Sequence, residues 1–203
     1  MSLNTSYTTA IDFYAAQRMY KFVPSTAGNY AFITSGQPAT AYVYLLNSTG
    51  TVVVSKYSSA TFTLIFTLNA GETYYFRSNF SSGSQIGSFQ VKLTTSYKVT
   101  YDANNGANAP AAQDKVNGET LKLQTGIPFR NGYNFMGWGT TSTTSTVSYL
   151  PGVDYTANAN ITLYAVWQAA SAISLNTAYS TSIDFGGQYC MYKFIPSSTG
   201  KYS

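Results

Sequence analysis

The side chains that most often carry enzyme chemistry are sparse in this sequence. It contains no histidine, so the commonest general base, triad member and metal-binding imidazole are all missing. None of the seven acidic residues lies within a few positions of another, as a compact calcium loop requires. These residues are Asp12, Glu72, Asp102, Asp114, Glu119, Asp154 and Asp184. A carboxylate pair assembled by the fold stays open, but we expect no enzyme, no catalytic residue, no cofactor and no metal site.

Two tryptophans are the first candidates for ligand contact, because an aromatic face can stack on a sugar ring. Trp138 and Trp167 each end a stretch with strand character. In that position a large amphipathic ring closes a small core. We therefore expect both tryptophans to be core residues rather than a binding site.

A pair of tyrosines is the second candidate. Tyr42 and Tyr44 alternate with Val43 and Leu45, so the two sets point to opposite faces of a strand. An exposed tyrosine set beside Asn and Ser would suit a glycan or a protein partner. Alternating aromatics are also ordinary sandwich core, and the sequence favours core for this pair.

Lys21 and Cys190 are the remaining residues with distinctive chemistry. A buried lysine can form an isopeptide bond with asparagine, but alternation points Lys21 away from the side of Tyr20 and Phe22. If those aromatics are buried, the lysine lies in water. Cys190 is the only cysteine, which excludes an internal disulfide, so packing must supply the stability.

Composition favours an exported β-protein. Charged residues make up 9% of the chain, against an ordinary share of about 25%, whereas a hydrophobic share of 44% suffices for packed cores. The net charge is +4, but the basic residues are scattered, so we expect no nucleic-acid partner. No apolar stretch is long enough to cross a membrane. The N-terminus lacks a secretion signal, and we take the chain for an internal piece of a longer precursor.

An internal repeat sets the organisation. The segment 2–5 recurs as 174–177, and 19–22 recurs as 191–194. Both pairs lie 172 positions apart (174 − 2 and 191 − 19), which indicates a duplicated unit. The chain therefore holds one full unit, and residues 173–203 form the incomplete start of a second one.

Strand signals fill the full unit, and no segment shows a helical period with a cap and a stop. Seven stretches rich in β-branched and aromatic residues alternate with turn signals and predict a β-sandwich over residues 1–95. These stretches are 20–23, 30–33, 42–46, 51–54, 61–68, 73–77 and 89–93. After a boundary near Thr95 and Ser96, further strands at 98–101, 120–123, 133–138 and 161–167 predict a second, smaller module over 97–168.

The first module resembles the bacterial pre-peptidase C-terminal type of domain. The resemblance lies in the segments 20–24, 28–32, 42–47 and 68–76. It implies a jelly-roll-like β-sandwich of secreted and surface proteins. That family often carries acidic residues around its third strand, where this chain has Ala41 and Asn47, so the resemblance does not extend to a calcium site.

The second module resembles the Listeria-Bacteroides repeat, also called the internalin B-type repeat. The resemblance lies in Val99–Gly106, Arg130–Trp138 and Ile161–Trp167. It implies a small β-grasp-like fold within large adhesin-like surface proteins. Such repeats are usually regarded as spacers or weak interaction modules.

Together these observations predict an all-β, non-catalytic repeat unit of a bacterial cell-surface or secreted adhesin or stalk, located outside the cell. Its work would be spacing and weak multivalent contact with a glycan or a host or cell-surface protein. A carbohydrate-binding accessory module of a secreted hydrolase is one alternative, and a strand-exchanging filament subunit is another. For the partial repeat, three outcomes stay open: docking on its own chain, donation of strands to a neighbouring molecule, or a tail without a packing partner.

Overall fold

The computed structural model describes residues 1–201 and divides into two compact units. Unit 1 comprises residues 1–97 and 116–118, and unit 2 comprises residues 98–115 and, within the described part of the chain, 119–201. The described residues form fifteen strands and no helix, which confirms the all-β prediction. It follows that none of them belongs to a helix able to cross a membrane.

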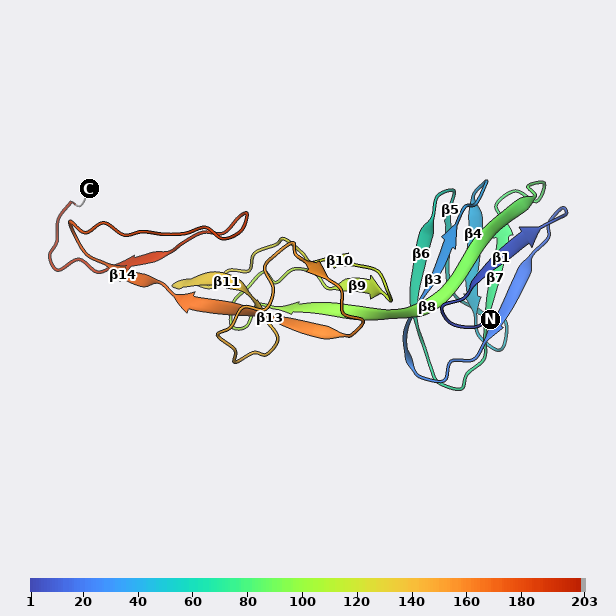
Figure 1. Ribbon diagram of the computed structural model, residues 1–203, viewed down its shortest axis with the longest axis horizontal. Helices are drawn as coiled ribbons and strands as arrows, with labels where there is room; N and C mark the ends of the chain where they lie inside the picture. Colours follow the sequence, from blue (N-terminus) through green and yellow to red (C-terminus); the bar gives the residue numbers. More distant parts are fainter. Residues whose placement is uncertain (202–203) are drawn as a thin grey trace. The chain divides into compact units, whose positions relative to one another are not determined.

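Unit 1 is a sandwich of two four-stranded antiparallel sheets, drawn mainly in blue to green in Figure 1. One sheet has the order β1-β8-β3-β6, made of Ser6–Ile11, Gly87–Asp102, Gly28–Ser35 and Phe62–Leu68. The other has the order β2-β7-β4-β5, made of Arg18–Phe22, Tyr74–Phe80, Ala41–Leu46 and Val52–Ser58. The two orders together are those of an eight-stranded jelly roll.

The core of the sandwich is built from alternate residues of both sheets. Phe32 and Phe76, one from each sheet, are fully buried, and their rings stack with centroids 4.7 Å apart. Phe66 packs on Phe76 at 5.5 Å. Rings of this size bury a large apolar area without a polar group that needs a partner, so they suit the space between two sheets.

Unit 2 is a small β module whose strands are joined by long connections. β11 (Tyr133–Gly139) pairs antiparallel with β13 (Ile161–Ala169), which pairs in parallel with Val99–Asp102 of β8. β9 (Gln113–Val116) also pairs with β8. The short strands β10 (Leu121–Lys122) and β12 (Asp154–Tyr155) pair with each other.

The core of unit 2 centres on one tryptophan. Trp138 is completely buried and meets the rings of Tyr101 and Phe135 edge to face, each at 5.0 Å. Gly137 lets the chain around Tyr149 approach the preceding strand, because a Cβ at this position would lie 2.6 Å from the Val147 side chain. Its φ of 138° also disfavours a larger residue. A glycine beside the central ring is therefore part of how this core closes.

The strand pattern departs from the sequence prediction at several places. The short strands β9 and β12 were not predicted, and two further differences concern β8 and β1. The stretches 89–93 and 98–101 were expected to be separate strands on either side of a boundary, but both belong to β8. Small polar residues in the middle of β8 look like a linker, yet Thr94 and Ser96 are buried and fit a sheet. β1 was not predicted, because Thr9 fills a buried position where an apolar residue gives the stronger signal.

The partial repeat docks on its own chain, within unit 2. β14 (Ser171–Ile173) and β15 (Tyr192–Phe194) pair in parallel. The ring of Phe185 packs edge to face on Phe135 at 5.8 Å. Asn134 donates a hydrogen bond to the carbonyl of Met191 at 3.2 Å and accepts one from its amide. This contact within one chain corresponds to the first of the three outcomes left open by the sequence, and strand donation between molecules stays a prediction for the experiment below.

Local conformation recurs between the two copies, although the second lacks the rest of a sandwich. Asn4 and Asn176 both have a left-handed backbone, with φ of 61° and 57°. Ser2 donates its amide to the Tyr7 hydroxyl at 2.7 Å, and Ser174 does the same to Tyr179 at 2.8 Å. The opening turn of the repeat is therefore encoded by its own residues and needs no sandwich around it.

Because the partial repeat is docked, we expect it not to drive assembly. Residues 1–203 and a chain ending at Ala172 should both elute as monomers in size-exclusion chromatography with light scattering. A mass that rises with concentration for the longer chain alone would instead support strand exchange between molecules.

Candidate ligand-binding face

The outer face of the sheet β2-β7-β4-β5 carries the best candidate site. Val43 and Leu45 are fully buried, so Tyr42 and Tyr44 point outward and are half-buried. The prediction that this tyrosine pair belongs to the core is therefore wrong. The inner face of this sheet is filled by Val43, Leu45 and rings such as Phe76, whereas the outward tyrosines keep their hydroxyl groups in water.

The tyrosines form an ordered row across the sheet. The ring of Tyr57 on β5 lies 4.8 Å from that of Tyr42, at 24° between planes. Tyr42 and Tyr44 are 6.0 Å apart and inclined by only 12°. The guanidinium carbon of Arg77 on β7 lies 4.2 Å over the Tyr44 ring, within the range of a cation–π interaction. We call Tyr57, Tyr42, Tyr44 and Arg77 the tyrosine row.

Strand pairing explains why these residues meet. Tyr57 lies opposite Tyr42, and Arg77 lies opposite Tyr44, so each pair shares one face of the sheet. Asn79 is the other neighbour of Tyr42. The outward tyrosines therefore lie beside the amide side chain of Asn79, and tyrosines beside asparagine are an arrangement that would suit a glycan ligand.

The tyrosine row leaves specific groups open to a ligand. Tyr57 is on the edge strand β5 and is 63% exposed, so it is the ring of the row most open to solvent. The hydroxyl groups of Tyr42, Tyr44 and Tyr57 make no hydrogen bond within residues 1–201. The row thus offers one stacking ring and three hydroxyl groups that can donate or accept hydrogen bonds.

Of the other candidate residues from the sequence, only Lys21 lies on this face. Trp138 is fully buried, which confirms the core prediction for it. Trp167 is half-buried: it packs against the core of unit 2 and donates its indole N–H to the carbonyls of Ala103 and Asn104 at 2.9 and 3.0 Å. Cys190 has no disulfide partner. Lys21 is exposed as predicted, and it lies opposite Tyr75 on the same face as the tyrosine row.

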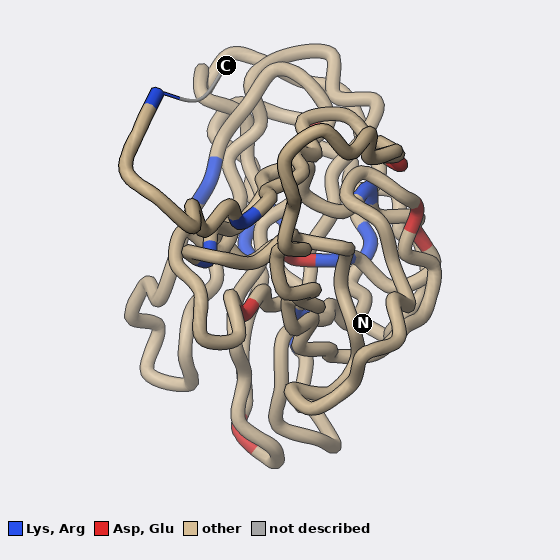
Figure 2. Tube along the Cα trace, turned by 90° about the vertical axis from the view of Figure 1, so that its left-hand side faces the viewer, with Lys and Arg blue, Asp and Glu red and all other residues tan. Residues whose placement is uncertain are grey.

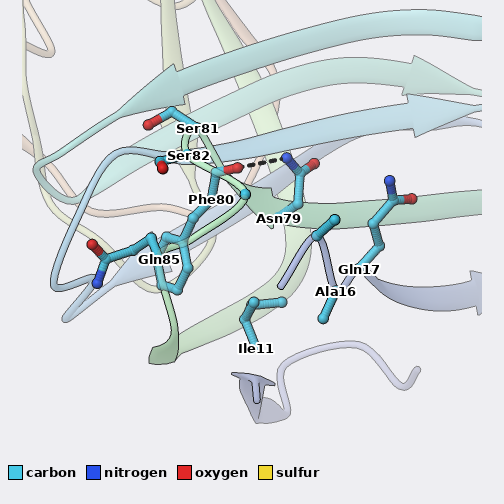
Figure 3. A pocket seen from close by; sticks show the side chains of 10 residues that line it. Ile11, Ala16, Gln17, Asn79, Phe80, Ser81, Ser82 and Gln85 are labelled. Atoms are coloured by element: carbon cyan, nitrogen blue, oxygen red, sulfur yellow. Dashed lines mark hydrogen bonds between the residues drawn. The ribbon is translucent and has the colours of Figure 1, made fainter. Parts of the chain in front are cut away.

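The two pockets described here contain few side chains that could carry out chemistry. A small pocket of unit 1 has a volume of about 160 Å³, and none of the side chains that line it is charged. Figure 3 shows Ile11, Ala16 and Phe80 of this pocket beside amide and hydroxyl side chains. Asn79 donates there to the carbonyl of Phe80 at 2.8 Å. A second pocket, in unit 2, contains Asp184 and Cys190. Within residues 1–201, no three acidic or cysteine side chains gather as metal ligands do.

Lys115 is a buried cation that the sequence pattern does not indicate. Lys115 is 1% exposed, and its ammonium group donates to the Asn158 side chain at 2.8 Å. Burial lowers its pKa, and the nearby charge of Glu119 opposes that shift. The residue sits on a strand of only four residues, too short for alternation to show which side is covered. Its hydrogen bond makes it a satisfied structural lysine.

Burial raises the pKa values of Tyr101 and Tyr155 above the usual 10.0, so we expect unit 2 to lose stability in alkali. The neutral phenol is favoured in the folded state, so this stabilisation is complete below pH 10.0 and is lost as the pH rises through the folded-state pKa values. We expect the urea midpoint of unit 2 to fall between pH 9 and pH 11, and to fall less in Tyr155→Phe. An equal fall in both proteins would contradict this origin.

Comparison with known proteins identifies the class of the second unit. Residues 97–166 match the model of the Listeria-Bacteroides repeat domain, which confirms the resemblance seen in the sequence. This repeat is typical of bacterial extracellular and surface proteins. The match covers about a third of the chain and leaves the jelly roll outside it. No curated protein matches the chain.

Proposed function

We propose that this chain is a non-catalytic unit of a bacterial cell-surface or secreted adhesin or stalk, and that it acts outside the cell by spacing and by weak, repeated contacts. The observation that carries the proposal is a surface-type repeat domain inside a sequence that starts again after 172 positions. Repetition raises avidity without a tight single site.

The separate cores of the two units support a mechanical role. Each unit has its own buried core and no disulfide, so each can stand in a chain of similar units without covalent staples. The repeated turn at residues 2–7 and 174–179 supports a further copy of the sandwich as the next element. Such a chain would project its exposed faces at regular intervals.

Carbohydrate binding is the second candidate function, and the tyrosine row favours it. A chain that carries this row on an accessory module would keep a secreted hydrolase near its polysaccharide. The two candidates share a non-catalytic contact surface and differ in what lies elsewhere in the parent protein.

The test for weak multivalent binding uses the full chain at controlled density. Beads that carry residues 1–203 at increasing surface density are passed over immobilised polysaccharides and over cells. We expect negligible retention of the soluble chain and retention that rises steeply with density, by about 10² to 10⁴ overall. Tight retention at every density would contradict a role based on weak, repeated contacts.

A further inference from the structure

Two cations on the outer face of the sheet β2-β7-β4-β5 face no acidic partner of their own unit. Arg77 on β7 belongs to the tyrosine row. Lys21 lies on the adjacent strand β2, opposite Tyr75 of β7. The two acidic residues of unit 1 are engaged elsewhere. Asp12 pairs with Arg18 at 2.6 Å, and Glu72 accepts a hydrogen bond from the Tyr74 hydroxyl at 2.6 Å.

The charges of this face are therefore of one sign. Figure 2 shows how few coloured segments, blue for Lys and Arg and red for Asp and Glu, interrupt the tan chain. In so sparsely charged a protein, two cations on one sheet face without a carboxylate give that face a positive potential. A ligand that carries anions would be attracted to it.

We propose that this face binds an acidic polysaccharide, with a sugar ring on Tyr57 and carboxylates of the polymer at Arg77 and Lys21. The proposal rests on the weak-contact function above and names its ligand class. The face crosses four strands, a span of about 14 Å at the usual strand spacing, so it suits an extended oligosaccharide rather than a single sugar. Arginine can bind a carboxylate through two parallel hydrogen bonds while its plane stacks on an aromatic ring.

The same geometry disfavours nucleic acid as the occupant. The rings of Tyr42 and Tyr44 lie nearly parallel to each other and close to their neighbours, so they do not form a series of open platforms for successive bases. The hydroxyl groups of the tyrosines and the Asn79 amide instead match a ligand rich in hydroxyl groups.

Affinity electrophoresis of the full chain tests the proposal, in gels that contain either polygalacturonate or neutral galactan. We expect stronger retardation by polygalacturonate, weakened by added salt. Arg77→Gln should weaken this binding about tenfold, since it removes a charge-assisted pair. Lys21→Gln, on an exposed side chain, should weaken it about threefold. Tyr57→Ala should weaken binding to both polymers.

Two controls keep the outcomes distinct. Lys92→Gln removes a cation from the other sheet of unit 1 and should leave binding unchanged, and circular dichroism should show every variant folded. Equal retardation by both polymers would overturn the acidic preference but leave glycan binding standing. Retardation by neither polymer would overturn the proposal of a glycan-binding site on this face. The bead experiment tests the weak multivalent contacts of the proposed function separately. Tighter binding of a single-stranded oligonucleotide would also overturn the proposal of a glycan-binding site.

Discussion

Trp138→Ala is expected to cost unit 2 a large part of its stability while the stability of the jelly roll of unit 1 stays unchanged. The substitution empties the centre of a small core, where Trp138 contacts Tyr101 and Phe135. Loss of a buried tryptophan costs about 3 to 5 kcal/mol, against a typical total stability of about 5 to 15 kcal/mol for a domain. Both tryptophans lie in unit 2, so the fluorescence of the remaining Trp167 reports the unfolding of that unit in urea.

Trp138→Phe is the matched control for that substitution. The indole N–H of Trp138 is buried without a hydrogen-bond partner in the structure, so a phenylalanine removes an unsatisfied donor while it keeps most of the ring. We expect it to cost far less than alanine. Near-equal losses for the two variants would show that the ring does not hold this core together.

Gly106→Ala is expected to destabilise unit 2 and to change the fluorescence of Trp167. A Cβ at this position would lie 2.7 Å from both the carbonyl oxygen of Phe129 and a ring carbon of Trp167. The carbonyl belongs to a backbone bridge between Ala107 and Phe129 and cannot move alone. Overpacking of this kind costs about 1 to 3 kcal/mol. The shifted indole would also lengthen its hydrogen bonds to Ala103 and Asn104.

Gly186→Ala serves as the control within the same unit, because nothing lies within 4 Å of its added Cβ. The urea midpoint and the tryptophan emission of both variants are compared with those of the parent chain. If Gly186→Ala lost as much stability as Gly106→Ala, glycine flexibility rather than close approach would explain the effect.

Much of the fold could be predicted from the sequence, because a strand with one buried face has buried and exposed residue types in alternation along the chain. β4 is the clearest case, with Val43 and Leu45 alternating with two tyrosines. The same alternation cannot say which set is inside when both are apolar. That choice depends on the opposite sheet, where phenylalanines such as Phe32 fill the available space.

The candidate ligand-binding face was harder to predict from the sequence than the strands were. Tyr57 and Arg77 are separated by 77 − 57 = 20 positions and come from strands that do not neighbour each other, so only the sheet order β2-β7-β4-β5 brings them to one row. A signal was present nonetheless. Arg77 sits in a strand of predominantly apolar residues, where a cation marks the solvent side.

We propose that unit 1 makes its contacts through the tyrosine row. Amide NMR shifts of the full chain, followed during titration with polygalacturonate fragments, test it most directly. The largest changes are expected at Tyr42, Tyr44, Tyr57 and Arg77 and at their strand neighbours, with little change in unit 2. Changes centred on another surface, or no changes at saturating ligand, would contradict the account.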